Sequence, residues 1–412
     1  MWTRYIIKCR TCQKLSNLRV QIPEKEEMPI SFECGNCKSE ISGVLRVDFK
    51  KPDFNYEPNR GEIVADAQFN EGDYFVEFSD TLQVAKPSTS PHDLILATLR
   101  QGTGDFEKNK MAKDLRKLQS DEEWEDLKDL CKVYPNNNTA VKTLTYRILE
   151  RIYPEHIYKI DIEPDYRKNF FLCLNYFVFP WIDKKNHKKF VDYLTEDLFS
   201  TPDFNNTEIN DFTGNVMDNT RVDKLTQDCL SLIIRWIDLR DYFHYVVHNT
   251  HASQSHASVE NFTSLKNFYT DCFELIGREG DLIFRCQNIS ERGAQNDIPS
   301  GCPRNVTDAD SFKTIDNGRK LEIINLSSNV EPKSVFSNSF LSKLRNGINH
   351  NKVNFDATNQ IINYYPITRR PDERHQISYI DFLKTSLDAF NSILKLLQLI
   401  KMRSNYIYFK SK

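Results

Sequence analysis

The stretch SYIDFLKTSLDAFNSILKLLQLI, residues 378–400, decides the fold class. Ser378 followed by Asp381 matches a capping box, in which a serine and an acidic residue three positions later begin a helix. Leucine, isoleucine and phenylalanine then recur at alternating spacings of four and three, at Ile380, Leu383, Leu387, Phe390, Leu394 and Leu397. Because such a stripe must be buried, the stretch predicts a long amphipathic helix packed against other helices.

Helical periodicity extends over much of the chain before this stretch. Apolar residues lie three or four positions apart in the segments 93–101, 122–134, 139–153, 187–199, 222–247 and 259–276. The apolar run at 170–182 is interrupted by Asn175 and Pro180 and predicts a buried helix that then stops, too short to span a bilayer. Polar segments at 201–211 and from 278 to about 335 indicate loops.

The region just before the final helix has a third pattern. SVFSNSFLSKLRNGINH, residues 334–350, predicts a short helix, and VNFDATNQIINYYP, residues 353–366, predicts a β-hairpin around a polar turn. The start of the chain is different again. Short alternating runs in residues 1–50 predict strands, further strands follow near 63–78, and AKPSTSPHD at 85–93 is typical of a linker.

Two CxxC pairs lie within the N-terminal strands: Cys9 with Cys12, and Cys34 with Cys37. Two such pairs on facing turns supply the four thiolates of a tetrahedral Zn2+ site. Because four ligands leave no open position, the zinc is predicted to be structural and to supply folding free energy to a ribbon of about 50 residues. Gly35 suits the second turn, where amide groups can approach sulfur. The alternative is two unrelated cysteine pairs.

Other residue clusters are less specific. Lys8, Arg10, Lys14 and Arg19 surround the ribbon and leave open whether it binds nucleic acid or a protein. The scattered cysteines, among them Cys173, Cys229 and Cys272, are typical of buried core positions in a reducing cytosol. Four histidines occur within residues 244–256, where a polar helix end is favoured over a metal site because no HExxH carboxylate accompanies them.

The segment RNGINH, residues 345–350, contains the groups needed to cleave RNA without a metal. His350 is suited to general acid or base catalysis, and Arg345 offers a planar set of donors to a charged phosphorane. Asn346 lies four positions before His350 and is expected to orient its ring or the phosphate. Arg345 and His350 are roughly 140° apart around a helix, which favours a site shared by two chains. The alternative is an ordinary turn at Asn346-Gly347.

This segment resembles the motif of the HEPN superfamily, in which Arg, a polar residue that is often Asn, three variable residues and His follow one another. Arg345, Asn346 and His350 fit the motif position by position. The hairpin at 353–366 and the final helix are similar to elements that follow the motif in bacterial members, although the long insert before it leaves the helix count of the bundle open.

The resemblance implies a metal-independent endoribonuclease that acts as a homodimer, with Arg345, Asn346 and His350 of both chains at the dyad. Such domains serve as toxins or as effectors of antiviral defence, and cut RNA to 2′,3′-cyclic phosphate ends. Arg369, Arg370 and Arg374 are candidates for contacts with the RNA backbone, unless they form only a solvated loop. The resemblance implies no cofactor for catalysis.

Composition and length limit the remaining possibilities. The net charge of −3 over 412 residues means that any nucleic-acid binding depends on a local basic patch, and the charged first residues predict no signal peptide.

We expect a cytoplasmic α+β protein, mainly α: a zinc ribbon at 1–50, a β extension and linker at 51–88, a helical middle domain at 89–215 and a HEPN-like helical bundle with a β-hairpin insert at 216–412. The N-terminal and middle regions are expected to bind a regulatory trigger or partner. The alternative function is a non-catalytic dimerisation or interaction protein.

Overall fold

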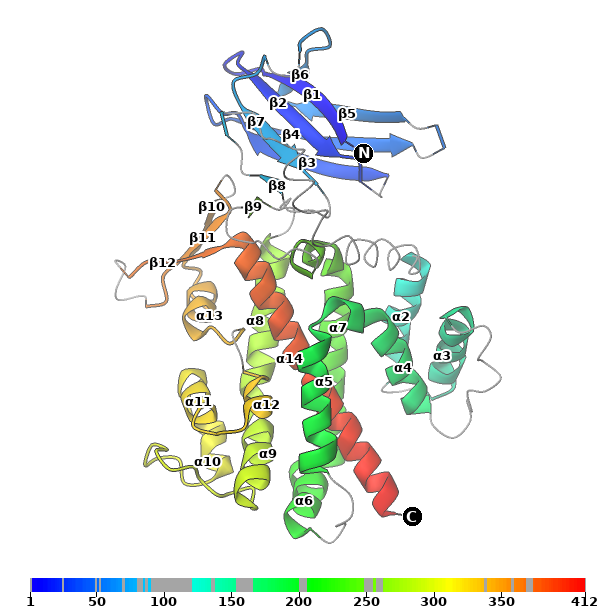
Figure 1. Cartoon of the computed structure of the whole chain (residues 1–412), viewed down its shortest axis with the longest axis vertical. Coiled ribbons are helices and arrows are strands. Elements are labelled where there is room, and N and C mark those ends of the chain that lie inside the picture. Colours follow the sequence, from blue (N-terminus) through cyan, green and yellow to red (C-terminus); the bar gives the residue numbers. More distant parts are fainter. Residues whose placement is uncertain are drawn as a thin grey trace. The chain divides into compact units, whose positions relative to one another are not determined.

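The computed structural model of the chain is shown in Figure 1. It describes residues 2–23, 26–48, 50–51, 53–68, 71–79, 84–85, 88–89, 121–134, 138–152, 166–199, 206–247, 255–256, 262–336, 339–356, 359–367 and 373–411. None of the helices in these ranges is both long enough and apolar enough to cross a membrane.

Two compact units are built from alternating segments of the chain. The first unit contains Met1–Asp114, Arg240–Leu265 and His350–Lys384, and the second contains Leu115–Leu239, Lys266–Asn349 and Thr385–Lys412. Three helices contribute residues to both units: α7 (Asn219–Val247), α8 (Phe262–Arg278) and α14 (Tyr379–Lys410). The expected division into four consecutive domains stays a prediction.

The first unit holds the described strands. They are β1 (Trp2–Cys9), β2 (Leu15–Gln21), β3 (Glu27–Glu33), β4 (Glu40–Asp48), β5 (Asp53–Asn59), β6 (Gly61–Ile63), β7 (Phe75–Phe78), β8 (Val84–Ala85), β9 (Ser255–His256), β10 (Val353–Asp356), β11 (Ile361–Tyr364) and β12 (His375–Ser378). Their sheets have the orders β6-β1-β2-β7, β3-β4-β5, β10-β11-β12 and β8-β9. All described pairings between these strands are antiparallel except that of β2 with β7.

The two N-terminal sheets share one core. Strand β3 alternates exposed and buried residues, so that Met28, Ile30 and Phe32 point to one face, as expected for a sheet covered on one side. These side chains cluster with Ile7 of β1 and Leu18 of β2 from the other sheet. Strands β5, β6 and β7, which were expected as an extension, pair with β4, β1 and β2 and complete both sheets.

The second unit is helical. Its other elements are α2 (Asp121–Val133), α3 (Asn138–Ile152), α4 (Tyr166–Val178), η2 (Phe179–Trp181), α5 (Lys184–Asp192), η3 (Tyr193–Leu198), α6 (Thr207–Asp211), η4 (Phe212–Val216), α9 (Gly280–Arg292), α10 (Ala309–Thr314), α11 (Asn317–Ile324), α12 (Val330–Lys333) and α13 (Ser342–Asn349). The fully buried Trp236 of α7 stacks on Phe390 of α14, with ring centres 4.7 Å apart, and also contacts Trp124 and Trp181. The mainly α class is therefore confirmed.

The final helix has the predicted start and stripe. The Asp381 amide donates to Ser378 Oγ at 3.0 Å, and this hydroxyl donates to the Asp381 carboxylate at 2.6 Å. All six apolar residues of the predicted stripe are buried. The predicted core positions Cys173, Cys229 and Cys272 are fully buried as well, and burial raises the pKa of each thiol.

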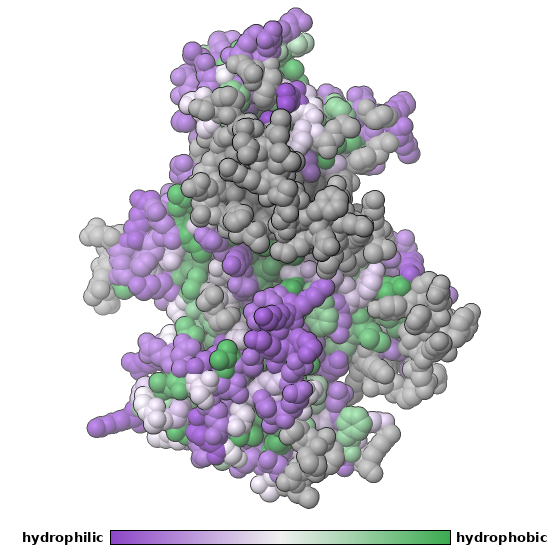
Figure 2. Space-filling view, viewed as in Figure 1, coloured by the Kyte–Doolittle hydropathy of each residue, from purple (hydrophilic) through white to green (hydrophobic). Residues whose placement is uncertain are grey.

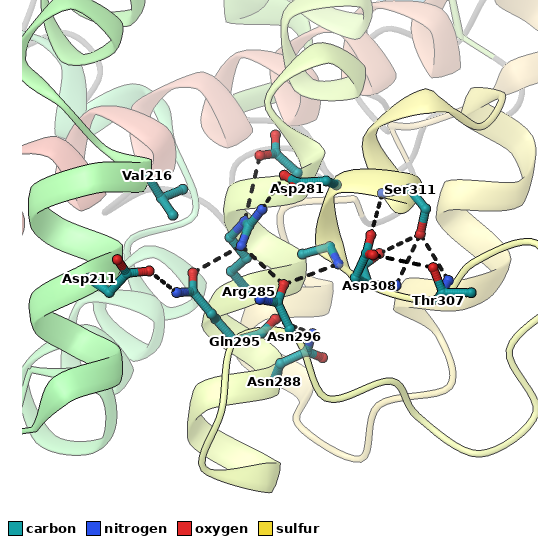
Figure 3. A network of polar contacts seen from close by, with 12 residues as sticks. Asp211, Val216, Asp281, Arg285, Asn288, Gln295, Asn296, Thr307, Asp308 and Ser311 are labelled. Atoms are coloured by element: carbon teal, nitrogen blue, oxygen red, sulfur yellow. Dashed lines mark hydrogen bonds and ion pairs between the residues drawn. The ribbon is translucent and has the colours of Figure 1, made fainter.

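Two segments expected as loops are helical instead. Within 201–211, Asn206 caps α6 by accepting from the Glu208 and Ile209 amides. The polar stretch from 278 to 335 contains α9, α10, α11 and α12. Its polar residues face inward: Arg285 of α9, only 4% exposed, donates to Gln295 at 3.0 Å and to Asn296 at 3.3 Å (Figure 3). Buried polar side chains therefore lie beside the buried apolar residues of α9, among them Leu282, Cys286 and Ile289, and give the stretch its polar composition.

Candidate metal centre and active site

The four cysteines of the two CxxC pairs meet in the first unit. The Sγ atoms of Cys9 and Cys37 are 3.7 Å apart, and those of Cys12 and Cys34 are 3.5 Å apart. All four sulfur atoms lie within 4.8 Å of one another. A tetrahedron with metal–sulfur bonds of about 2.3 Å has sulfur atoms about 3.8 Å apart, so the spacing fits one metal ion.

Each CxxC pair lies on a turn of the same construction. In the turn between β1 and β2, the Gln13 amide donates to the Cys9 carbonyl at 2.8 Å, and Gln13 has a φ of 63°. In the turn between β3 and β4, the Lys38 amide donates to the Cys34 carbonyl at 3.0 Å, and Lys38 has a φ of 60°. Positive φ is uncommon outside glycine, and its repetition at matching positions shows that two equivalent turns present the sulfur atoms.

The surroundings of the sulfur atoms favour the thiolate at two positions. A hydrogen bond from the Lys14 backbone lowers the pKa of Cys12 to about 6, and the Ser39 side chain lowers the pKa of Cys37. Burial raises the pKa of Cys34. Thiolates are the form that binds metals, and four sulfur ligands are a set that Zn2+ accepts in structural sites. The cluster can therefore hold a structural metal ion.

Gly35 has a further role beside the expected one, since backbone amides of Asn36 and Cys37 do bond to the Cys34 sulfur. A Cβ atom at this position would lie 2.4 Å from Cγ of Tyr74. The ring of Tyr74 also lies 5.8 Å from the Lys38 ammonium, measured to its centre. The turn therefore requires glycine because a distant aromatic ring packs against it, and this contact is not visible in the local sequence.

Most of the basic residues around the ribbon are already paired with acids. Lys8 lies 3.1 Å from Glu62, and Lys14 lies 3.2 Å from Asp73. Arg19 and Glu77 are neighbours across β2 and β7 and form a buried ion pair. These pairings neutralise three of the four cations proposed for nucleic-acid binding, so the ribbon offers a weaker phosphate-binding surface than its sequence suggests.

In the second unit, neighbouring side chains hold the guanidinium of Arg345 on α13. Its Nε donates to Glu274 Oε1 of α8 at 2.5 Å, and Nη2 is ion-paired with the same carboxylate. Its Nη1 donates to Asn346 Oδ1 at 3.1 Å, and Cζ lies 5.9 Å from the centre of the Phe273 ring. The Arg345 side chain is 28% exposed, so the cation is oriented and still partly accessible.

The other two motif residues, Asn346 and His350, lie in and just after the short helix that the sequence predicted. The Asn346 side chain bonds to the adjacent Arg345, whereas the ring of His350 or a phosphate was the expected partner. Helix α13 ends at Asn349, and His350 is exposed in the turn that follows. The division between the two units falls between Asn349 and His350. The structure thus brings Arg345 and Asn346 together and places His350 one residue beyond their helix.

Glu274 is the residue of this site that sequence reasoning missed. It lies 71 positions before Arg345 in the chain and also accepts a hydrogen bond from Asn349 at 3.5 Å. The apolar pattern of α8 marks its buried face but assigns no role to a carboxylate beside that face. Opposite charge was the one available signal, and it does not select among the many acidic residues of the chain.

Several other candidates lie outside the described residues. These are the side chains of His244, His248, His251 and His256, and both Arg369 and Arg370. The metal site considered for the histidines therefore stays untested. Of the three arginines suggested for RNA contacts, Arg374 is described, and its guanidinium donates to Asn363.

Comparison with known proteins matches this chain to no protein-family model, no curated protein and no solved structure. The resemblance of residues 345–350 to the HEPN motif therefore rests on the residues themselves. The contacts of Arg345 and of the four cysteines are the physical basis for a functional proposal.

Proposed function

We propose that the protein is a metal-independent endoribonuclease of the HEPN type, with Arg345, Asn346 and His350 as its catalytic residues. The observation that best supports this is the oriented guanidinium of Arg345, held by Glu274 and Asn346 just before an exposed histidine. A fixed cation and an accessible imidazole within one short segment are the groups that cleavage through the RNA 2′-hydroxyl requires.

The proposed reaction needs only the RNA and these side chains. The 2′-oxygen bonds to phosphorus while His350 accepts its proton, and Arg345 stabilises the negative charge that builds on the phosphate oxygens. The bond from phosphorus to the 5′-oxygen then breaks, and that oxygen takes a proton from an acid. Because each motif has one histidine, His350 of a second copy is proposed as the acid. The products carry 2′,3′-cyclic phosphate and 5′-hydroxyl ends.

The same contacts favour a second candidate, a non-catalytic interaction protein. Arg345 is neutralised by Glu274 within the folded unit, as in an ordinary structural ion pair. A carboxylate beside the guanidinium also repels an incoming phosphate, so binding of RNA requires additional cations. In this alternative, the helical region serves for dimerisation and the cysteine cluster supports a module that binds nucleic acid or a partner protein.

The other parts of the chain are assigned supporting roles in the first proposal. The four cysteines hold a structural Zn2+ ion, for which the sulfur geometry provides support. The N-terminal and middle regions sense a regulatory trigger or keep the nuclease inactive, and the protein acts in the cytoplasm as a toxin or antiviral effector that cuts cellular or viral RNA. This division of roles follows from the order of the segments and the proposed activity.

The decisive experiment is cleavage of single-stranded RNA by the full chain in EDTA, with the termini of the products identified chemically. His350→Ala and Arg345→Ala should lose cleavage. Lys343→Ala is the matched control, because Lys343 is an exposed cation on the same helix. Since EDTA can extract zinc from cysteine sites, the folded state is monitored in the same buffer by circular dichroism.

Growth of cells that express each variant provides a parallel measurement. If wild type and the Lys343→Ala control arrest growth while His350→Ala and Arg345→Ala do not, the nuclease proposal is supported even where a repressed state hides activity in the purified protein. Equal cleavage by all variants would falsify the assignment of these residues. A complete absence of both cleavage and toxicity would favour the interaction protein.

A further inference from the structure

Strands β10, β11 and β12 form a three-stranded sheet (Figure 1). Because side chains alternate along each strand, this sheet has two chemically different faces. Tyr364 is paired with Val353 and His375 in one row, and Ile362 is paired with Phe355 and Ile377 in another row of the same face. Phe355 of this face stacks on Phe262 with ring centres 4.8 Å apart. This face is therefore packed within the first unit. The residues that alternate with these along each strand lie on the opposite face.

The opposite face is mostly polar, and its exposed side chains lie on or next to the outer strands β10 and β12, whereas Asn363 of the central strand is only 7% exposed. Its middle row consists of Asn354, Asn363 and Gln376, which are paired across the three strands. The next row is set by the Tyr365 amide, which donates to the Lys352 carbonyl at 3.0 Å. Lys352, Asn354, Arg374 and Gln376 are exposed, and Tyr365 is partly exposed. Hydrophilic residues cover much of the surface in the region of these strands (Figure 2).

Hydrogen bonds organise this face. Asn363 Oδ1 accepts from Arg374 Nε at 2.9 Å, from Arg374 Nη2 at 2.6 Å and from Gln376 Nε2 at 2.9 Å. The guanidinium of Arg374 therefore lies along the sheet instead of extending into solvent. A cation that is already oriented loses less side-chain entropy when it binds an anion.

The charges on the face are separated. Lys352 and Arg374 belong to the row of Tyr365, so that a lysine and an arginine flank an aromatic ring. The carboxylate of Asp356 is bonded to Asn359 at the hairpin turn, at the other end of β10. Glu373 lies 3.2 Å from His375, whose ring stacks on Tyr364 of the packed face. The cations of Lys352 and Arg374 therefore lie toward the Tyr365 end of the polar face, away from Asp356.

We propose that the face formed by Lys352, Asn354, Tyr365, Asn363, Arg374 and Gln376, here called the amide face, binds single-stranded RNA. An unpaired base stacks on Tyr365, the phosphates contact Lys352 and Arg374, and the exposed amides of Asn354 and Gln376 form hydrogen bonds with base edges. Aromatic rings flanked by cations are a general solution for single strands, since every base has a stacking surface. The positive charge complements the phosphate backbone in a chain whose net charge is −3.

This inference rests on the proposed function and specifies its substrate. Lys352 follows His350 by two residues in the chain. An RNA strand bound to the amide face therefore contacts the protein close to the proposed catalytic histidine. Unpaired RNA is also the form in which a 2′-oxygen can align with its own phosphate.

Binding is tested with the full chain carrying His350→Ala, which prevents cleavage. The probes are a fluorescein-labelled single-stranded RNA of mixed sequence, the same RNA as a duplex, and single-stranded DNA of the same sequence, each followed by anisotropy in EDTA. Adding Tyr365→Ala should weaken binding of the single-stranded RNA about tenfold, whereas Tyr365→Phe should retain it. Lys352→Ala should lower the slope of log affinity against log salt by about 1. Lys384→Ala, another exposed lysine of the first unit, is the control.

The outcomes separate this inference from the proposed function. If the parent binds no single-stranded RNA, prefers the duplex, or is unaffected by Tyr365→Ala, the inference is overturned, although RNA cleavage by the wild-type chain would still support the nuclease. If binding depends on Tyr365 but the wild-type chain never cuts RNA, the amide face is supported as an RNA-binding site and the proposal of nuclease activity is rejected. Equal binding of the DNA strand keeps the stacking site but removes its selectivity for RNA.

Discussion

The cysteine cluster and the Arg345 site differ in how much of the chain is needed to build them. The four cysteines lie on two equivalent turns, and their sulfur atoms lie within 4.8 Å of one another. Arg345 depends on Glu274, which a separate helix supplies from 71 positions away. The first site is therefore complete in two local turns, whereas the second exists only when two helices are packed. Loss of a ligand should affect folding at the first site and chemistry at the second.

The largest expected effect is the loss of metal from the cysteine cluster. Cys9→Ser should reduce bound zinc from about one ion per chain to almost none, because the remaining ligands no longer close a tetrahedral set. Structural zinc sites contribute apparent binding free energies of about 10–16 kcal/mol, so the first unit should be destabilised by several kcal/mol. Metal content by mass spectrometry and thermal unfolding measure the two effects.

Cys302→Ser is the matched control, because Cys302 is a partly buried free thiol outside the cluster. It should leave the metal content unchanged. If Cys9→Ser retained both zinc and stability, the cluster would not be the structural centre that its geometry indicates. The shared core of the two N-terminal sheets should preserve part of the fold even without metal.

The next effect concerns Arg345 and separates chemistry from folding. Arg345→Ala should slow RNA cleavage by about 10²–10³-fold, the usual cost of removing one group that stabilises transition-state charge. It should change the free energy of unfolding by less than about 1 kcal/mol, because its ion pair with Glu274 is partly exposed. A large loss of stability with no loss of cleavage would make Arg345 structural and remove the difference between the two sites.

The buried imidazole of His187 should make the stability of the fold depend on pH. Burial, opposed in part by the hydrogen bond from His187 to Asn391 and assisted by Lys395 and Lys401, lowers the pKa of His187 to about 4. Between about pH 6.5 and 4, His187 is therefore protonated in the unfolded chain but neutral in the folded chain. The resulting stability is complete above pH 6.5 and decreases as the pH falls, by about 3 kcal/mol at pH 4.

Urea unfolding at several pH values measures this dependence. His187→Gln should flatten the acid side of the profile, since glutamine can still bond to Asn391 but does not titrate. A profile that His187→Gln leaves unchanged would show that this imidazole does not set the acid stability of the fold.

The smallest expected effect is at Glu274. Glu274→Gln keeps the shape of the side chain and removes the charge that orients Arg345, so cleavage should fall about tenfold with little change in stability. Because the substitution also removes a charge that repels phosphate, KM should improve while kcat falls. A parallel fall in kcat with Arg345→Ala, and no added loss in the double variant, would show that both residues act as one unit.

Local signals predicted those parts of the fold whose chemistry is local. The capping residues Ser378 and Asp381 form their predicted bonds, and the apolar stripe that follows is buried. The two CxxC pairs converge as their spacing indicates. Strand β12 was not anticipated, because only its pairing with β11 distinguishes HQIS from a loop. The four helices within 278–335 were missed because buried polar side chains such as Arg285 stand beside their buried apolar residues and give the stretch a polar composition.

The sequence by itself determined the mainly helical class, the long final helix and the cysteine ligand set, since each depends on periodicity or spacing within a few turns of the chain. Tertiary structure decided which carboxylate holds Arg345, why Gly35 must be glycine, and which residues share the amide face. These relations join residues that are far apart in the chain. They depend on the packing of whole elements, which no local pattern encodes.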